Sequence, residues 1–404
     1  MKNKFTLIFA LCLWSVATLG GGYQVRLQGH KQTGFGLIGT PFARDASSIF
    51  YNPGSLAFYE GKFSISAGAS GIFSNVLFQM QGMDYQARTD NPTGTPFYGY
   101  VSYKFKDMIA IGVGVYTPFG STTKWDDNWA GRYLIRDIKL SAIYIQPTIA
   151  YNYKDKFGIG AGFVYATGSV ELNKALPYSP DSKVNLSGKA DNFGFNAGLF
   201  FKPTEKLNIG VDYRSEISMD LEAGDATFTV PVALQTMVPD TNYFDASLPL
   251  PANLDFGIAY QVNDKLTLAA EVNWIIWSSY ESLDFTFENN PELLNSENPR
   301  EYKDTWIPRI GGEYKLNDIF TLRAGAYFDP SPASEEYFTP ETVTLNTIAF
   351  TLGASITPLK GLDIDISYLE LHGLEAEKNY SPDNFAGTYK TAAFIPGIGL
   401  SYRF

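Results

Sequence analysis

The chain has 404 residues, 42 acidic and 31 basic side chains, 15% aromatic residues and one cysteine. This composition excludes a disordered protein, because 45% of the residues are hydrophobic, and it excludes a fold built on disulfides. The formal net charge of -11 argues against nucleic-acid binding, which needs basic surfaces to neutralise phosphates. A helical membrane protein is also excluded, since no stretch beyond Gly22 holds the roughly 18 to 20 consecutive apolar residues of a spanning helix.

The first residues have the pattern of a signal peptide. Lys2 and Lys4 form a basic start, an apolar run covers 5-19, and small residues follow it. An uncleaved anchor is the alternative, but the run is short and lacks a stop-transfer flank. Because Cys12 lies inside this segment, the expected mature chain has no cysteine. We therefore predict a cleaved signal peptide at 1-20 and a protein of the bacterial envelope.

Residues 21-60 form a turn-rich segment ahead of the first strand pattern. Glycine and proline are frequent in it, which would suit a free periplasmic tail. The segment also has many apolar residues: Val25, Leu27, Phe35, Leu37, Ile38, Phe42, Ile49, Phe50 and Leu56. These favour a segment that is buried by the domain following it, residues 61-404.

Residues 61-404 have an apolar period of two, which indicates β-strands. In one clear case Leu266, Leu268 and Val272 alternate with smaller or polar residues. In a soluble sandwich the apolar face would be the core, whereas in an outer-membrane barrel it would face lipid. We predict strands at 62-72, 97-106, 108-116, 141-153, 157-171, 193-203, 207-219, 254-262, 266-277, 305-315, 319-328, 347-357, 362-370 and 394-404.

The lengths of the connections distinguish these two architectures. Six connections between the expected strands are tight turns, and they alternate with seven connections of roughly 18 to 34 residues. Membrane barrels have short periplasmic turns and longer outer loops, while sandwiches follow no such rule. Backbone polar groups in lipid must all be paired, so the sheet must close. We predict an all-β, transmembrane antiparallel barrel of 14 strands, with residues 21-60 in its lumen as a plug.

Pro118 follows the strand expected at 108-116 and lacks the N–H that a ladder requires. It either ends that strand and begins an outer loop, or it marks a break within the wall. Inward-facing charges on other strands, including Glu271, Arg309, Glu313 and Arg323, are expected to form a paired network that anchors the plug.

Motifs for chemistry are scarce. The glycine pattern of residues 34-39 is not set in a βαβ unit, and His30 and His372 have no cysteine partner for zinc. A surface lipid-hydrolysing enzyme would have to start from His372 with Glu370 or Glu375, and a loop histidine beside glutamate is usually just solvated. We predict no catalytic residue, no metal and no cofactor.

Several short stretches resemble the FadL family of outer-membrane transporters of long-chain fatty acids and other hydrophobic compounds. They cover nearly the whole expected mature chain and include Gly22-Tyr23-Gln24-Val25, Ala43-Arg44-Asp45-Ala46-Ser47-Ser48, Asn52-Pro53-Gly54, Trp129-Ala130-Gly131-Arg132, Tyr213-Arg214-Ser215-Glu216 and Phe328-Asp329-Pro330-Ser331-Pro332. The resemblance implies a 14-stranded barrel plugged by an N-terminal hatch, here residues 21-60. It also implies that ligands leave sideways through a gap at a kinked strand, which favours a kink at Pro118, Phe119 and Gly120.

The resemblance also implies which residues form the hatch and hold the ligand. Asp45, Asn52 and Pro53 match the hatch pattern, whereas Gly54 replaces the family's alanine and is expected to loosen this stretch. The family binds a ligand's polar head with a Ser, an Arg and a Lys. The Ser position falls on Thr117. The Arg position falls on Leu172, which cannot pair a carboxylate, and the Lys position falls near Asn298 in an outer loop. Lys174 lies two residues beyond Leu172 and therefore on the same strand face, and Arg300 lies close to Asn298. The candidate ligand-binding residues are therefore Thr117, Lys174 and Arg300.

The function expected from these patterns is passive uptake of a hydrophobic small molecule, most simply a fatty acid, across a bacterial outer membrane. The expected partners are that ligand, outer-membrane lipid, and the barrel-assembly machinery, which would read the aromatic end Ser401-Tyr402-Arg403-Phe404. A monoaromatic hydrocarbon is the alternative ligand. A structural barrel or adhesin is a different class, and it would have no ligand-sized apolar cavity.

Overall fold

The structure, a computed structural model, describes residues 22–404, and the predicted signal peptide at 1-20 lies outside the described residues. The described chain folds into a single sheet of twenty strands. This sheet closes on itself, because β1 (Phe63–Ser70) pairs with β4 (Phe97–Phe105) on one side and with β20 (Phe385–Arg403) on the other. Within residues 22–404 no helix has the length and hydropathy needed to cross a membrane.

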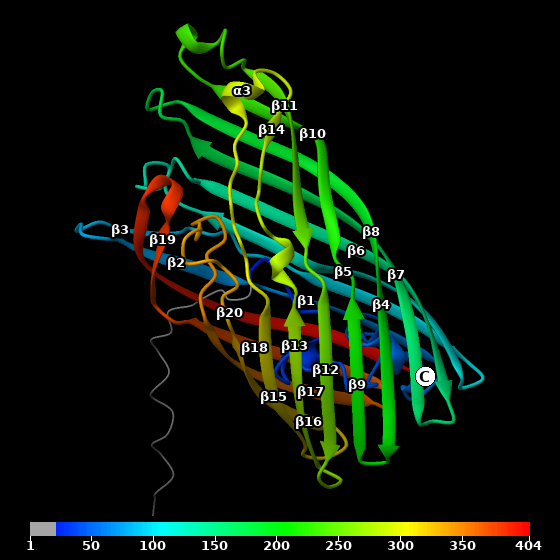
Figure 1. The fold of residues 1–404 in the computed structure, drawn as a ribbon. Helices are drawn as coiled ribbons and strands as arrows, with labels where there is room; N and C mark the ends of the chain where they lie inside the picture. The colour runs from blue at the N-terminus through cyan, green and yellow to red at the C-terminus, as the bar shows by residue number, and fades with distance from the viewer. Residues whose placement is uncertain (1–21) are drawn as a thin grey trace, which may run out of the picture.

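Fourteen antiparallel strands form the wall of the barrel, as predicted (Figure 1). Between β4 and β20 the wall consists of β5 (Ile109–Lys124), β6 (Asp137–Tyr153), β7 (Phe157–Ala175), β8 (Lys183–Thr204), β9 (Leu207–Arg214), β12 (Asn253–Gln261), β13 (Leu266–Ile275), β15 (Thr305–Lys315), β16 (Phe320–Asp329), β17 (Thr347–Leu359) and β18 (Leu362–Gly373).

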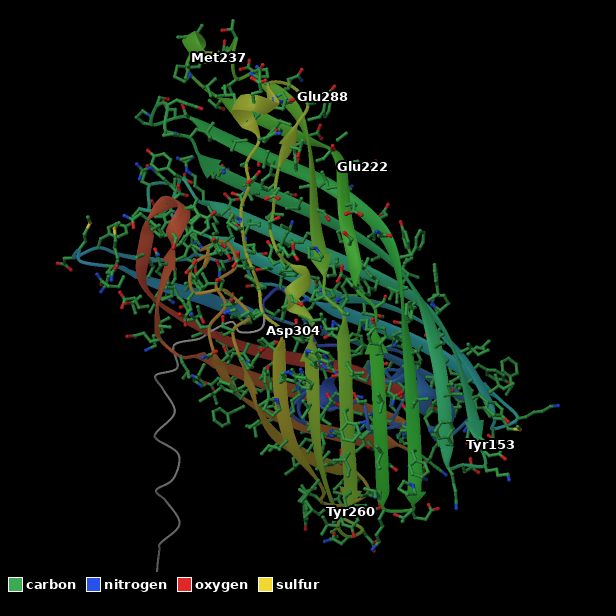
Figure 2. The ribbon with its side chains drawn as sticks, viewed as in Figure 1. Tyr153, Glu222, Met237, Tyr260, Glu288 and Asp304 are labelled. Carbon is green, nitrogen blue, oxygen red and sulfur yellow. The ribbon has the colours of Figure 1, made fainter. Side chains whose placement is uncertain are left out.

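Three wall strands are interrupted and continue toward the loops. The continuations are β2 (Phe73–Met80) after β1, β10 (Ile217–Thr229) after β9, and β11 (Thr241–Leu250) before β12. The loops also contain β3 (Gln86–Arg88), β14 (Thr286–Phe287), β19 (Ala376–Tyr380) and α3 (Pro291–Leu294). Tyr153 and Tyr260 mark the end with the short turns, and Glu222, Met237 and Glu288 lie toward the opposite end (Figure 2). We call these the turn side and the loop side.

The wall has its apolar residues on the outside. Ile310 is 64% exposed and Leu352 is 59% exposed, whereas Gln146, Asn196 and Glu271 are buried in the interior. This arrangement is the reverse of a soluble sandwich, and it suits a barrel whose outer face meets lipid.

Several strands are longer than the sequence predicted. β5 continues to Lys124 rather than ending at residue 116, and β8 begins at Lys183 rather than at residue 193. The connection between β7 and β8 is therefore much shorter than expected. The reason is that the outward positions become polar on the loop side, as at Asp191 and Lys139, so the apolar alternation that predicts a membrane strand is lost there.

Residues 22–60 lie inside the barrel, where the blue segment of Figure 1 is seen. This segment contains α1 (His30–Thr33), α2 (Ser48–Tyr51) and a 3-10 helix, η1 (Pro53–Phe58). Helix α1 lies against β17 and β18, while η1 lies against β6, β7 and β8. Nearly all side chains from Tyr23 to Ala57 are buried.

Candidate functional site: a wall gap and two cavities

The ladder between β4 and β5 stops part of the way up the wall. The last paired residues are Tyr98 and Tyr116, and the register between β5 and β6 shifts between Tyr116 and Phe119. Pro118 within this bulge has no N–H to donate. The hydroxyl of Thr117 accepts a hydrogen bond from the Phe97 amide at 3.0 Å. Pro118 therefore does not end the strand: it sits in a kink, beyond which β5 has no partner in β4.

The free edge of β5 is paired with the start of the described chain. The amide of Val25 donates to the Pro118 carbonyl at 2.7 Å, and the amide of Gly120 donates to the Tyr23 carbonyl at 2.9 Å. Gln28 also donates to the Thr117 carbonyl at 2.7 Å. Residues 23–25 therefore act as a short strand that occupies the gap in the wall. Tyr23, Val25 and Leu27 alternate with polar residues, a period-two signal that would have predicted this strand.

A cavity of about 550 Å³ lies behind this gap, and we call it the lumenal cavity. Thr117, Gly120 and the loop residues Pro92 and Pro96 line its rim at the gap. Residues of β15, β16, β18 and β20 also line this cavity, namely Ile307, Arg309, Tyr327, Asp329, Leu369, Leu371 and Ile395.

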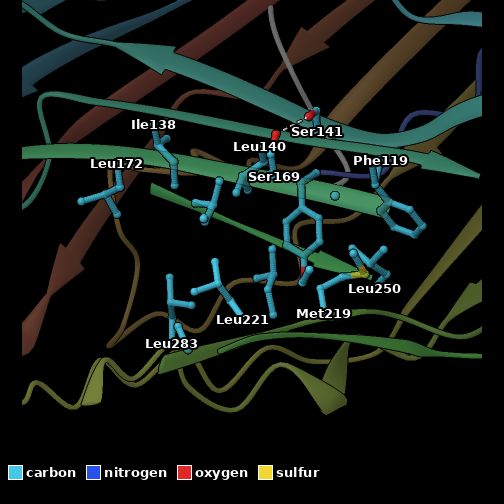
Figure 3. A pocket seen from close by; sticks show the side chains of 18 of the residues that line it. Phe119, Ile138, Leu140, Ser141, Ser169, Leu172, Met219, Leu221, Leu250 and Leu283 are labelled. Atoms are coloured by element: carbon cyan, nitrogen blue, oxygen red, sulfur yellow. Dashed lines mark hydrogen bonds between the residues drawn. The ribbon is translucent and has the colours of Figure 1, made fainter. Parts of the chain in front are cut away.

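A second, narrower cavity lies toward the loop side, and we call it the apolar pocket. Most of its lining is apolar, with Phe119, Leu140, Leu172, Met219 and Leu221 pointing into it (Figure 3). The two cavities share the lining residues Phe119, Gly120, Leu140, Ser141 and Ala142. They are therefore adjacent, and the gap-lining residues Phe119 and Gly120 lie at their boundary.

The predicted ligand-binding residues fall in two places. Thr117 lines the lumenal cavity and is hydrogen-bonded to the backbone of Phe97. Lys174 and Arg300 lie close enough to Glu341 to interact electrostatically with it, and Arg300 donates a hydrogen bond to Glu341 at 2.7 Å. Burial disfavours the charged form of Arg300, but Glu341 together with the nearby tyrosines, such as Tyr280, more than offsets this effect, so the pKa of Arg300 lies above its ordinary value. Because Glu341 lines the apolar pocket, the cationic pair is beside that pocket and already has an anionic partner.

Ion pairs connect residues 22–60 to the barrel wall. Arg26 pairs with Asp255 at 2.9 Å and with Glu271 at 3.1 Å, and Arg309 pairs with the same oxygen of Glu271 at 3.1 Å. Lys31 also pairs with Asp363, and Arg44 pairs with Glu313, which in turn pairs with Arg323 of the neighbouring wall strand. The charged residues expected to form a network are thus paired, and they hold the segment against four different strands, β12, β13, β15 and β18.

The predicted hatch residues fix the fold of this segment. Asp45 accepts a hydrogen bond from Lys31 at 3.0 Å and another from the Ser47 amide at 2.9 Å. Asn52 donates to the carbonyls of Thr40 and Leu199, at 2.8 and 2.9 Å, and so joins the segment to β8.

Gly54 does not loosen the Asn52-Pro53-Gly54 stretch, contrary to expectation. A Cβ atom at Gly54 would lie 2.6 Å from the carbonyl oxygen of Gly198, and one at Gly160 would lie 2.3 Å from the carbonyl oxygen of Pro53. The backbone here runs so close to the wall that alanine would not fit without a shift. Glycine therefore permits tight packing at this position.

Comparisons with known proteins agree with this architecture. Residues 11–404 match the family described as outer membrane protein transport protein (OMPP1/FadL/TodX). The chain is 25% identical to a putative outer membrane protein of Neisseria meningitidis, over 100% of this chain and 98% of the relative. It is 22% identical to the long-chain fatty acid transport protein of Escherichia coli K12, with the same coverage of both chains.

Solved structures show the same fold. A FadL homologue from Pseudomonas aeruginosa superimposes with a TM-score of 0.82 at 22% identity, covering 95% of this chain and 100% of the homologue. The toluene transporter TbuX of Ralstonia pickettii gives a TM-score of 0.73 at 19% identity, covering 93% and 98% of the two chains. Relatives named for fatty acids and for aromatic hydrocarbons are therefore both present.

Proposed function

Because the chain belongs to the outer membrane protein transport family (OMPP1/FadL/TodX), and is thus a bacterial outer-membrane transporter of hydrophobic compounds and not an enzyme, we propose that it carries long-chain fatty acids. The proposed route runs from the apolar pocket, past Phe119, to the lumenal cavity and out sideways between β4 and β5. The adjacency of the two cavities at the gap carries this proposal. In the proposed mechanism, residues 21-60 are the hatch that fills the lumen, and Pro118, Phe119 and Gly120 form the lateral gate in the wall.

Two adjoining cavities suit an extended ligand better than a compact aromatic ring. The apolar pocket is narrow, and Glu341 in its lining forms an ion pair with Arg300. The lumenal cavity continues the path on the other side of Phe119. A long amphiphile can place its chain along this path with its carboxylate toward Lys174 or Arg300. In this proposal Thr117 contributes nearer the gap, where its hydroxyl would have to exchange its bond to the Phe97 carbonyl for one to the ligand. Toluene has no charged head, so it gains nothing from these cations.

Release into the membrane is favoured over release into the periplasm. Each buried CH2 group contributes about 0.8 kcal/mol, so a chain of sixteen such groups would lose roughly 13 kcal/mol on entering water. Lateral exit avoids this loss, and outer-membrane lipid is then the acceptor. We also infer that barrel-assembly machinery recognises the end of the chain at Phe404, a residue that is 63% exposed.

Gly120→Trp tests the lateral route. An added Cβ at Gly120 meets only the carbonyl oxygen of Leu140, at 3.3 Å, so a shift of a few tenths of an ångström admits a side chain at the mouth of the gap. We expect uptake of radiolabelled oleate by cells to fall at least tenfold, with oleate binding to the purified protein retained. Gly99→Trp is the matched control, because Gly99 also has open space but lies in the intact ladder between β4 and β5.

Undiminished uptake by a folded Gly120→Trp protein would instead indicate axial passage through the lumen. The ligand class is tested by competition on the unaltered protein. Oleate should displace a bound fluorescent fatty acid at concentrations at which toluene does not. Displacement by toluene alone would assign the protein to aromatic hydrocarbons.

A further inference from the structure

The wall contains a second interruption, between β8 and β10, and strands β5 to β8 separate it from the first. The paired residues of β8 stop at Asn196, opposite Arg214 of β9, and resume only at Ser187, opposite Asp225 of β10. Residues 188–194 of β8 therefore have no paired residue in β9 or β10. A bulge in β10, where its register with β11 shifts between Leu221 and Gly224, lies at the upper end of this seam.

Apolar side chains close this seam in place of a complete backbone ladder. A Cβ atom at Gly188 would lie 2.3 Å from the side chain of Leu221, and one at Gly194 would lie 2.6 Å from Ile217. The side chains of β10 thus lie directly on the glycines of β8. In the middle of the seam, the side-chain amide of Asn192 donates a hydrogen bond to the backbone carbonyl of Ser218 at 2.7 Å.

The seam leads into the apolar pocket. Gly188 and Ala190 on its β8 side line that pocket, as do Met219 and Leu221 on its β10 side. Figure 3 shows Met219 and Leu221 across the pocket from Leu140 and Ser169. A chain that separated β8 from β10 would therefore meet apolar side chains immediately behind the wall.

The lower end of the seam lies at the boundary of the lipid hydrocarbon. On the outer face of β8, Phe195 and Phe193 are 51% and 58% exposed, whereas Asp191 and Lys189 follow as the next outward residues. Aromatic residues followed by charged ones mark the level at which a barrel leaves the hydrocarbon. The seam thus begins where the chains of the outer leaflet end and their polar heads begin.

We propose that the seam between β8 and β10 is a side entrance through which a single-chain amphiphile, already dissolved in the outer leaflet, passes into the apolar pocket. The inference rests on the proposed function and adds a source of ligand to it. Opening the seam mainly separates apolar contacts, and an entering acyl chain replaces them with similar ones. Separating a complete ladder would instead break a series of backbone hydrogen bonds, which the acyl chain cannot replace.

Engineered disulfides can lock the seam. Gly194→Cys with Ile217→Cys, and Gly188→Cys with Leu221→Cys, are suitable pairs, since the Cβ atoms of a disulfide lie about 3.8 Å apart and these positions are in contact. Asn185→Cys with Thr227→Cys is the control, because it joins the same two strands where they are already paired.

The measurement uses a diazirine-bearing stearic acid mixed into the lipid of nanodiscs that contain the purified protein. After a brief flash, mass spectrometry gives the initial rate at which peptides containing Leu140 or Leu172 are labelled. The seam disulfides should lower this rate at least fivefold, reduction should restore it, and the control disulfide should leave it unchanged. In detergent solution the protein locked between residues 194 and 217, neither of which lines the apolar pocket, should still bind oleate within twofold, which shows that the pocket is intact.

Unchanged labelling with both seam disulfides formed would overturn the side entrance while leaving fatty-acid transport standing. Absence of labelling and of oleate binding in the reduced proteins would overturn the fatty-acid function, and the entrance with it.

Discussion

The turn-side and loop-side halves of the barrel differ in what fills them. On the turn side the lumen is occupied by residues 22–60, which are joined to the wall by buried ion pairs such as Arg26 with Asp255 and by hydrogen bonds such as Asn52 to Leu199. On the loop side the wall strands are interrupted, and the space between them is lined by apolar residues such as Leu140 and Leu172.

This difference separates permanent contacts from exchangeable ones. Breaking a buried ion pair leaves an uncompensated charge, which is costly, so the turn-side contacts are expected to stay in place during transport. Apolar contacts are non-directional, and a hydrophobic ligand can replace them at little cost. The loop side is therefore suited to admit a ligand, and we expect the filled turn side to block water and ions.

Deleting residues 22–60 should have the largest effect on this arrangement. Without the segment, the lumen would hold water between inward-facing charges such as Glu271, Arg309 and Asp363. We expect the intact protein to give no steady current in planar bilayers and the deletion protein to give large, steady, porin-like currents. Such currents from the intact protein would contradict the assignment of these residues as a hatch.

Glu271→Ala should be strongly destabilising. The Glu271 carboxylate accepts hydrogen bonds from Arg26 and Arg309, at 3.1 Å each, and from the amide of Thr40 at 3.0 Å. Its loss leaves buried guanidinium groups short of a partner, which typically costs about 3 to 5 kcal/mol. The urea midpoint of unfolding in detergent measures the change.

Glu205→Ala is the control for this prediction. Glu205 also forms an ion pair, with Lys202 at 3.6 Å, but its side chain is 97% exposed in a turn. An exposed pair contributes at most about 1 kcal/mol, so the midpoint should hardly move. Equal midpoints for both variants would mean that the buried network does not hold the segment.

The turn-side half was largely predictable from the sequence. Lipid on one face and a polar lumen on the other impose strict alternation, so strands such as 305-315 and 362-370 were placed correctly or nearly so. The same alternation shows which charged residues face inward, and because the plug was expected to fill the lumen, these charges were predicted to be paired. The tight packing at Gly54 was not predicted, because it depends on the approach of Gly198 from a distant part of the chain.

The loop-side half was less predictable. Outside the hydrocarbon the outward residues of β5 and β8 become polar, so the strand extensions lack the apolar alternation. The grouping of Lys174 and Arg300 followed from the family resemblance, but their neutralisation by Glu341 involves residues far apart in the chain and carries no local signal. The seam between β8 and β10 is likewise a missing pairing, which no single strand reveals.

Glu341→Gln should have the smallest effect, and it tests the polar end of the apolar pocket. The carboxylate of Glu341 lines this pocket and holds Arg300 at 2.7 Å, so a fatty-acid carboxylate must compete with it. Glutamine keeps the shape but removes the negative charge, leaving Arg300 and Lys174 free to attract the ligand. We expect oleate to bind about five times more tightly, a change of roughly 1 kcal/mol, in a titration at neutral pH. Methyl oleate, which has no charge, should bind the two proteins equally. A similar gain for both ligands would show that the substitution acts through packing, and weaker oleate binding would place the head group elsewhere, for example near Thr117.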